Sequence, residues 1–127
     1  MSLDGDILNV LVGLMKEDRD TFVPARLSIL VHLYFTQSAV FTSLQKTLKL
    51  TSGNLSSHLK KLQSLGLVRI SKEFIELKPT TTVVITLEGA EKVRSQLLRM
   101  RELVSVVIEQ GVGEQPSEMD SSTAPTP

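Results

Sequence analysis

The spacing of apolar residues changes twice along this chain, and these changes constrain the fold more than any other feature. Before Gly66 the apolar residues recur every three or four positions, which is typical of amphipathic helices. From Val68 to Leu87 they alternate with polar residues or form a β-branched run, which is typical of strands. After Glu88 the helical spacing returns. The predicted order is therefore several helices, one two-stranded hairpin and a last helix.

Four helices are predicted before the hairpin. The first spans residues 3–17, and the second begins at Pro24, a favoured residue in a first helical turn. This second helix is apolar on most faces, so we expect it to be buried. Thr42 is expected to cap the third helix, and a tight turn separates that helix from the fourth, residues 52–65. The last two helices have the spacing of a helix-turn-helix.

The hairpin follows the helix-turn-helix directly. Residues 68–87 are expected to form it, with a long tip, and residues 88–110 form the last helix. A hairpin in this place is the wing of a winged helix. The predicted fold is therefore mainly α with a small β-hairpin wing, in one domain of residues 1–110. Residues 111–127 are rich in Gly, Pro, Ser, Thr and acidic residues, which predicts a disordered tail.

The composition excludes several classes of protein. The chain has no cysteine, so it has no disulfide, thiolate metal site or thiol switch. It has no metal-ligand motif, phosphate-binding loop or nucleophile elbow. We therefore expect no enzyme, no catalytic residue, no metal and no cofactor. Without a basic leader or an apolar run of about 20 residues, we expect a cytoplasmic protein that does not contact membranes.

The charge is unevenly distributed along the chain. The 14 Lys and Arg residues balance the 14 Asp and Glu residues, which taken alone argues against a nucleic-acid-binding protein. However, residues 41–78 carry a net charge of +5, while residues 1–24 and 111–127 each carry −3. The positive charge therefore gathers around the helix-turn-helix and the hairpin.

The fourth helix has one apolar and one polar face. Leu55, Leu59 and Leu62 share the apolar face, which predicts that it packs on the core. The opposite face carries short polar side chains and lysines, which suit close approach to the major groove of DNA. Asn54 can pair with adenine through two hydrogen bonds, whereas Lys60 and Lys61 are better suited to phosphates.

The last helix has apolar residues spaced alternately three and four apart, which is typical of helix pairing. This seam could dock on the first helix of the same chain or on a symmetry mate. We favour a two-fold dimer of the first and last helices, which would set two recognition helices about 34 Å apart. The predicted dimerisation residues are Ile7, Leu11, Leu14, Val93, Leu97, Met100, Val104 and Val107.

The run Leu50–Leu62, together with residues 41–44 and 66–68, resembles small winged-helix transcriptional regulators of the MarR/ArsR-like superfamily, of the single-domain archaeal and bacterial kind. The resemblance implies a homodimer on a pseudo-palindromic operator, with the fourth helix in the major groove and the wing on the backbone. Glu76 and Leu77 depart from the family, which often has Gly and Arg there. The predicted DNA contacts are Thr51, Ser52, Gly53, Asn54, Ser57, Lys60, Lys61, Lys72 and Lys78.

The sequence thus predicts a sequence-specific, homodimeric transcriptional regulator that binds double-stranded DNA. The alternative is a winged-helix module for protein–protein contacts in a larger assembly, since the local charge is only +5 and Glu76 would be repelled by phosphate. A small-molecule effector is compatible with the first function, although no residue pattern identifies one.

Overall fold

The computed structural model describes residues 5–111 and has the predicted order of helices and hairpin, with one further short strand between the second and third helices. The predicted tail therefore lies outside the described residues, except for residue 111. The elements are α1 (Gly5–Val12), η1 (Gly13–Glu17), α2 (Pro24–Thr36), β1 (Ser38–Val40), α3 (Phe41–Leu48), α4 (Ser52–Ser64), β2 (Val68–Ile75), β3 (Lys78–Ile85), α5 (Leu87–Val106) and η2 (Val107–Gly111), where η1 and η2 are π-helical turns.

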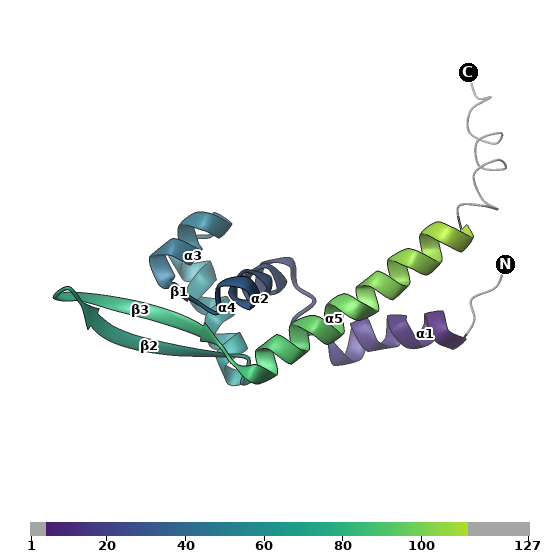
Figure 1. Ribbon diagram of the computed structural model, residues 1–127, viewed down its shortest axis with the longest axis horizontal. Coiled ribbons are helices and arrows are strands. Elements are labelled where there is room, and N and C mark those ends of the chain that lie inside the picture. Colours follow the sequence, from purple (N-terminus) through teal and green to yellow (C-terminus); the bar gives the residue numbers. More distant parts are fainter. Residues whose placement is uncertain (1–4, 112–127) are drawn as a thin grey trace, which may run out of the picture.

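The molecule is elongated and has three parts along its length (Figure 1). The hairpin β2–β3 forms a wing at one end, and α2, α3 and α4 form a head beside it. Helix α5 leaves the head and runs alongside α1 to the other end. We call α1, η1 and the part of α5 that extends beyond α2 the arm. The predicted fold class, a winged helix-turn-helix that is mainly α, is confirmed.

The wing belongs to an antiparallel sheet of three strands in the order β1-β3-β2. The short strand β1 pairs only with residues 82–84, so the outer part of the wing is a two-stranded ribbon. Ile75 pairs with Lys78, which leaves only Glu76 and Leu77 in the turn. The predicted long tip is therefore wrong. The turn lacks Gly and Asn, the usual signals of a two-residue turn, yet Glu76 and Leu77 have φ of 52° and 65°.

The core of the head lies where α2, α3, α4, α5 and the sheet meet. Leu55, Leu59 and Leu62 are all buried there, as their spacing predicts. The prediction that the second helix is buried is confirmed in part, because Ile29, Leu30 and Leu33 of α2 are buried in the core, whereas its Phe35 is 81% exposed. The prediction about the cap of the third helix is wrong. Thr42 does not cap α3, because Phe41 is already the first residue of that helix.

A buried carboxylate joins the arm to the head. Asp18, between η1 and α2, is fully buried. Its Oδ2 accepts a hydrogen bond from Arg99 Nε at 2.7 Å, and its Oδ1 accepts one from Arg99 Nη2 at 2.7 Å. Lys92 Nζ lies 2.9 Å from the same Oδ1. Burial alone would raise the pKa of Asp18, but the hydrogen bonds and charges of Arg99 and Lys92 outweigh it and hold this pKa below its usual value.

Candidate nucleic-acid interface

The outer face of α4 gathers most of the DNA contacts that the sequence predicts. Thr51, Ser52, Gly53, Asn54, Ser57 and Lys60 are all exposed. Thr51 and Ser52 stand at the start of the helix, whereas Gly53, Ser57 and Lys60 lie on the side opposite the three core leucines, with Asn54 beside them. The Thr51 hydroxyl caps the helix by accepting a hydrogen bond from the Asn54 backbone N–H at 3.1 Å. A side chain at Gly53 would meet nothing within 4 Å, so internal packing does not require a glycine there.

Lys61 lies to one side of this face. It is half-buried, and its Nζ is 3.8 Å from Asp20 Oδ1, in the connection between η1 and α2. An ammonium with an intramolecular carboxylate so close is a weaker phosphate ligand than Lys60, which has no such partner within the described chain.

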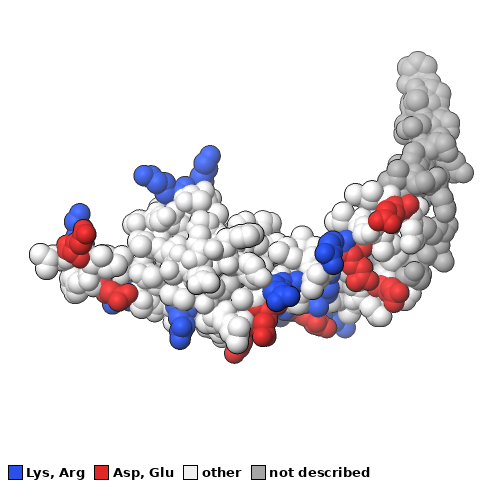
Figure 2. Space-filling view, viewed as in Figure 1, with Lys and Arg blue, Asp and Glu red and all other residues white. Residues whose placement is uncertain are grey.

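Two further lysines, which no sequence pattern singled out, stand beside the start of α4. Lys46 lies in α3, and Lys49 follows its end with a left-handed φ of 56°. Both are exposed, and Figure 2 shows blue side chains rising over α3. In helix-turn-helix proteins the first helix crosses the DNA backbone. The concentration of positive charge in residues 41–78 was the only signal in the sequence that included them.

A groove separates α4 from the wing. It has a volume of about 470 Å³, and Lys60 and Lys72 both line it, one from each side. Ser56 and Gln63 of α4 also line this groove, although the sequence did not point to them. Two ammonium groups on facing elements suit one strand of a polyanion that passes between the helix and the wing.

The end of the wing has a different character. Phe74 and Leu77 are 77% and 94% exposed, and Ile75 is also exposed. Lys78, a predicted DNA contact, lies here beside the turn rather than in the groove. Figure 2 shows both signs of charge at this end of the molecule. The end of the wing is therefore apolar and close to neutral, which is a poor surface for phosphates.

The predicted dimerisation residues fall into three groups. Ile7, Leu14 and Val93 are buried inside the chain, so these three do not form an exposed face for a partner. This part of the prediction is corrected, because the spacing of a seam does not tell which helix covers it. Leu11 and Met100 are half-buried, and Leu97, Val104 and Val107 are exposed. The arm also exposes apolar residues that were not predicted, namely Leu8, Val12, Met15 and Ile108.

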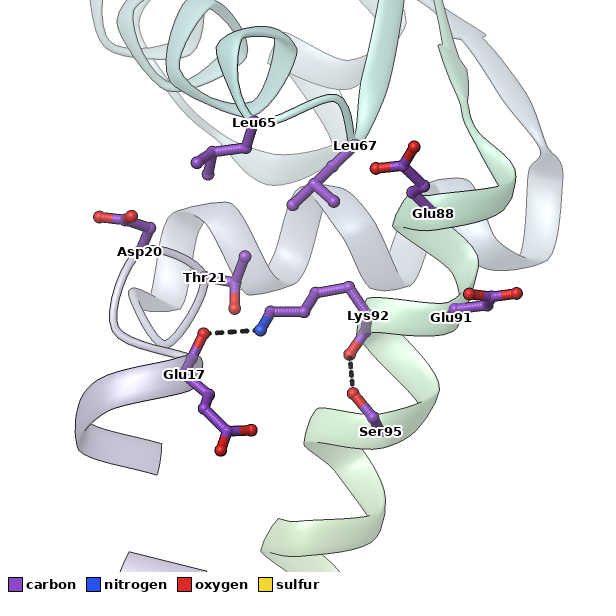
Figure 3. A pocket seen from close by; sticks show the side chains of 9 residues that line it. All are labelled: Glu17, Asp20, Thr21, Leu65, Leu67, Glu88, Glu91, Lys92 and Ser95. Atoms are coloured by element: carbon purple, nitrogen blue, oxygen red, sulfur yellow. Dashed lines mark hydrogen bonds between the residues drawn. The ribbon is translucent and has the colours of Figure 1, made fainter. Parts of the chain in front are cut away.

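A pocket of about 520 Å³ lies where the arm meets the head (Figure 3). Glu17, Asp20, Glu88 and Glu91 line it, whereas Lys92 is its one cationic side chain. Lys92 Nζ donates a hydrogen bond to the Glu17 carbonyl at 2.6 Å and also pairs with Asp18. The pocket is therefore acidic, and it would repel an anionic small molecule.

Residues 5–111 contain neither a candidate membrane span nor a cluster of metal ligands. No helix in that range is long and apolar enough to cross a membrane. No three or more His, Asp or Glu side chains in that range come together as a site for a metal ion.

A helix-turn-helix whose second helix turns short polar side chains and lysines outward, followed at once by a wing, defines the class of winged-helix DNA-binding proteins. The chain belongs to the family described as "Winged helix DNA-binding domain", whose model matches residues 25–104. The winged-helix class that the resemblance of residues 41–68 implies is thereby confirmed.

Known relatives support the same family. The uncharacterized protein MJ0432 of Methanocaldococcus jannaschii is 35% identical over 78 residues, which cover 61% of this chain and 85% of that protein. A transcriptional regulator homologue from Pyrococcus horikoshii OT3 has a TM-score of 0.74 at 33% identity and covers 78% of this chain and 97% of its own. A MarR family regulator from Silicibacter pomeroyi has the same fold, with a TM-score of 0.56 at 20% identity, over 94% of this chain and 75% of its own.

Proposed function

We propose that this protein is a transcriptional regulator that binds specific sequences of double-stranded DNA as a homodimer. One observation carries the proposal. The three leucines of α4 are all buried in the core, so the opposite face, with Asn54, Ser57 and Lys60, is free to enter a major groove. Short side chains near the start of a recognition helix allow the backbone to approach the bases closely.

The exposed groups divide between base and phosphate contacts. Asn54 has the two-pronged amide that pairs with adenine, and Ser57 can bond to a base or a phosphate. Lys46 and Lys49 at the turn, with Lys60 and Lys72 in the groove, are the proposed phosphate contacts. Lys61 is expected to contribute less because it already faces Asp20. Lys78 is also expected to contribute less, because Glu76 is two residues away in the turn.

The arm supports the dimer. Its two helices pack on one another and still expose apolar residues, including Met15 of η1 and Val104 of α5. Two packed helices with so much exposed apolar surface are typical of an interface with a further protein surface. A second copy of the arm supplies such a surface by two-fold symmetry, which is the commonest symmetry in soluble oligomers.

Replacing Lys60 with alanine should weaken binding to every DNA sequence and reduce the salt dependence of binding. The loss of one phosphate contact lowers the slope of log affinity against log salt by about one unit. Fluorescence anisotropy with labelled duplexes at several salt concentrations measures this slope. Lys16→Ala, at an exposed lysine of η1, is the matched control and should leave the slope unchanged.

Asn54→Ala, measured by the same anisotropy assay, tests whether Asn54 recognises bases. Its effect should fall on particular base pairs and should amount to about 1–3 kcal/mol of discrimination at those positions. An equal loss on all sequences would assign Asn54 to phosphate instead. If neither variant changes binding, α4 does not read DNA.

Replacing Val104 with aspartate should dissociate the dimer. This valine is 53% exposed in the single chain, so the substitution should hardly change the stability of the protomer. In a dimer it would bury an unpaired carboxylate, and we expect the dissociation constant to rise about a hundredfold or more. Sedimentation velocity measures the shift. Thr47→Asp, at an exposed position of α3, adds the same charge away from the arm and should have no effect.

The second candidate function is a module for protein–protein contacts. One observation favours it, which is the apolar end of the wing around Phe74 and Leu77. A lack of any shift on random duplex DNA at micromolar protein and low salt would support this function over the first.

A further inference from the structure

The proposed DNA surface and the arm leave two exposed apolar surfaces without a role, although Leu97, which the sequence predicts at the dimer interface, lines one of them. We define the wing tip as residues 73–78, whose apolar side chains are Phe74, Ile75 and Leu77. We define the α2–α5 groove as a hollow of about 270 Å³ that lies between the C-terminal half of α2 and the middle of α5. The residues that line this groove include Tyr34, Phe35, Arg94, Leu97, Leu98 and Arg101.

The wing tip carries more apolar surface than a turn needs. Leu77 is 94% exposed and has a left-handed φ of 65°, a backbone conformation that residues other than Gly, Asn and Asp rarely adopt. Asn-Gly would make the same two-residue turn with less strain. The identity of this side chain therefore has no explanation in the folding of the hairpin. Two carboxylates, Glu73 and Glu76, and one ammonium group, that of Lys78, accompany the apolar residues, so the tip has a net charge of −1.

The α2–α5 groove has the complementary chemistry. Phe35 is 81% exposed at its edge, and the ring of Tyr34 meets that of Phe35 edge to face with centroids 5.9 Å apart. Arg94 and Arg101 also line the groove, and neither forms a salt bridge with another described residue. The groove thus has apolar walls and two guanidinium groups that lack a partner in the described part of the chain.

We propose that the wing tip of one molecule docks in the α2–α5 groove of another. The apolar side chains of the tip would be buried against Phe35 and Leu98, and the carboxylates of Glu73 and Glu76 would meet Arg94 and Arg101. The occupant is a second copy of this chain, because both halves of the complementary pair are present in one sequence. The wing projects away from α5, so the tip does not reach the groove of its own molecule (Figure 1).

The contact joins two different surfaces, so it links molecules in a row rather than closing a two-fold pair. Few side chains take part, and a contact of this size is expected to be weak and transient. Weak contacts become effective when molecules are held side by side. Neighbouring dimers on one DNA would therefore bind cooperatively. This consequence rests on the proposed function, whereas the contact between wing tip and groove is independent of DNA binding.

The test measures self-association of the full chain by sedimentation velocity over a range of concentrations, without DNA. The fraction of species larger than the proposed dimer should increase with protein concentration. Glu76→Arg and Arg101→Glu should each weaken this growth about tenfold or more, because each places like charges together. An equal mixture of the two variants should restore it, because each tip then finds a groove of opposite charge.

Two controls separate the contact from other effects. Arg69→Glu makes the same charge change as Arg101→Glu, at an exposed position of β2 outside the tip, and should leave association unchanged. Replacing Glu76-Leu77 with Asn-Gly should keep the hairpin folded but remove the association.

Three results would overturn the proposal. The first is a wild-type chain that forms no larger species up to its solubility limit. The second is a mixture of the two charge variants that fails to restore association. The third is an Arg101→Glu variant that dissociates the proposed dimer itself, since the groove would then belong to the dimer interface. Loss of DNA binding affects none of these readings, because the experiment contains no DNA.

Discussion

Replacing Asp18 with alanine should lower the free energy of unfolding by about 3 kcal/mol, because it leaves two cations beside each other without their carboxylate. Arg99 and Lys92 both face Asp18 within 2.9 Å. Each keeps 24% of its side chain exposed, which places the loss at the lower end for buried ion pairs. Urea denaturation followed by circular dichroism, at one fixed protein concentration, measures the change.

Asp20→Ala is the matched control for this prediction. Asp20 lies two residues further on, and the partly exposed Lys61 Nζ lies 3.8 Å from its Oδ1. The hydrogen bond from Arg26 Nη1 to Asp20 goes to the backbone carbonyl, which alanine keeps. Its removal should cost about 0.5 kcal/mol or less, as for most surface ion pairs. Equal losses for the two variants would show that Asp18 does not hold the arm on the head.

The same carboxylate gives stability a dependence on pH. Because the folded chain lowers the pKa of Asp18, the unfolded chain binds a proton more readily than the folded one. Its contribution is therefore complete above the ordinary value of 3.8 and is lost as the pH falls through the lowered folded value. Stability of the wild type should fall in this acid window, and the Asp18→Ala variant should show a flatter dependence there.

The second large effect is expected at Gly89, in the first turn of α5. A Cβ at this position would lie 2.1 Å from the Leu67 carbonyl oxygen and 2.9 Å from Ile85 Cγ1. The nearest atom belongs to the backbone, and the same carbonyl accepts a hydrogen bond from the Thr86 N–H at 3.0 Å. Gly89→Ala should therefore displace α5 from the wing and destabilise the fold by about 3 kcal/mol or more.

Thermal denaturation of Gly89→Ala beside Gly53→Ala gives the sharpest comparison. Gly53 also lies in a helix, but a Cβ there would meet open space. Alanine at Gly53 should stabilise α4 by up to about 1 kcal/mol. A Gly89→Ala variant as stable as the wild type would contradict the close approach of α5 to Leu67.

The features that the sequence predicted well depend on contacts between near neighbours. Leu55, Leu59 and Leu62 lie on one face because of the pitch of the helix alone, and Gly66 follows the end of α4 with a left-handed φ of 78°. The turn of the wing was predicted wrongly because its residues, Glu76 and Leu77, carry none of the usual signals for positive φ. There the register of β2 and β3 overrides local preference.

The candidate site was predictable in part for the same reason. The outer face of α4 follows from the position of its core leucines, so Asn54, Ser57 and Lys60 could be identified. The ion pair of Lys61 could not be predicted, because its partner Asp20 belongs to a connection about forty residues earlier in the chain. The groove between Lys60 and Lys72 likewise needs two elements that only the fold places side by side.

The sequence by itself determined the order of the elements, the reading face of α4 and the concentration of positive charge around it, because helical and strand periodicity and charge are local properties. The tertiary structure decided how the arm is used. It buries Ile7, Leu14 and Val93 within the chain and leaves Val104 and Val107 exposed. An apolar seam favours burial in general, and only the packing of α5 against both α1 and the core of the head determines which of its residues remain for a partner.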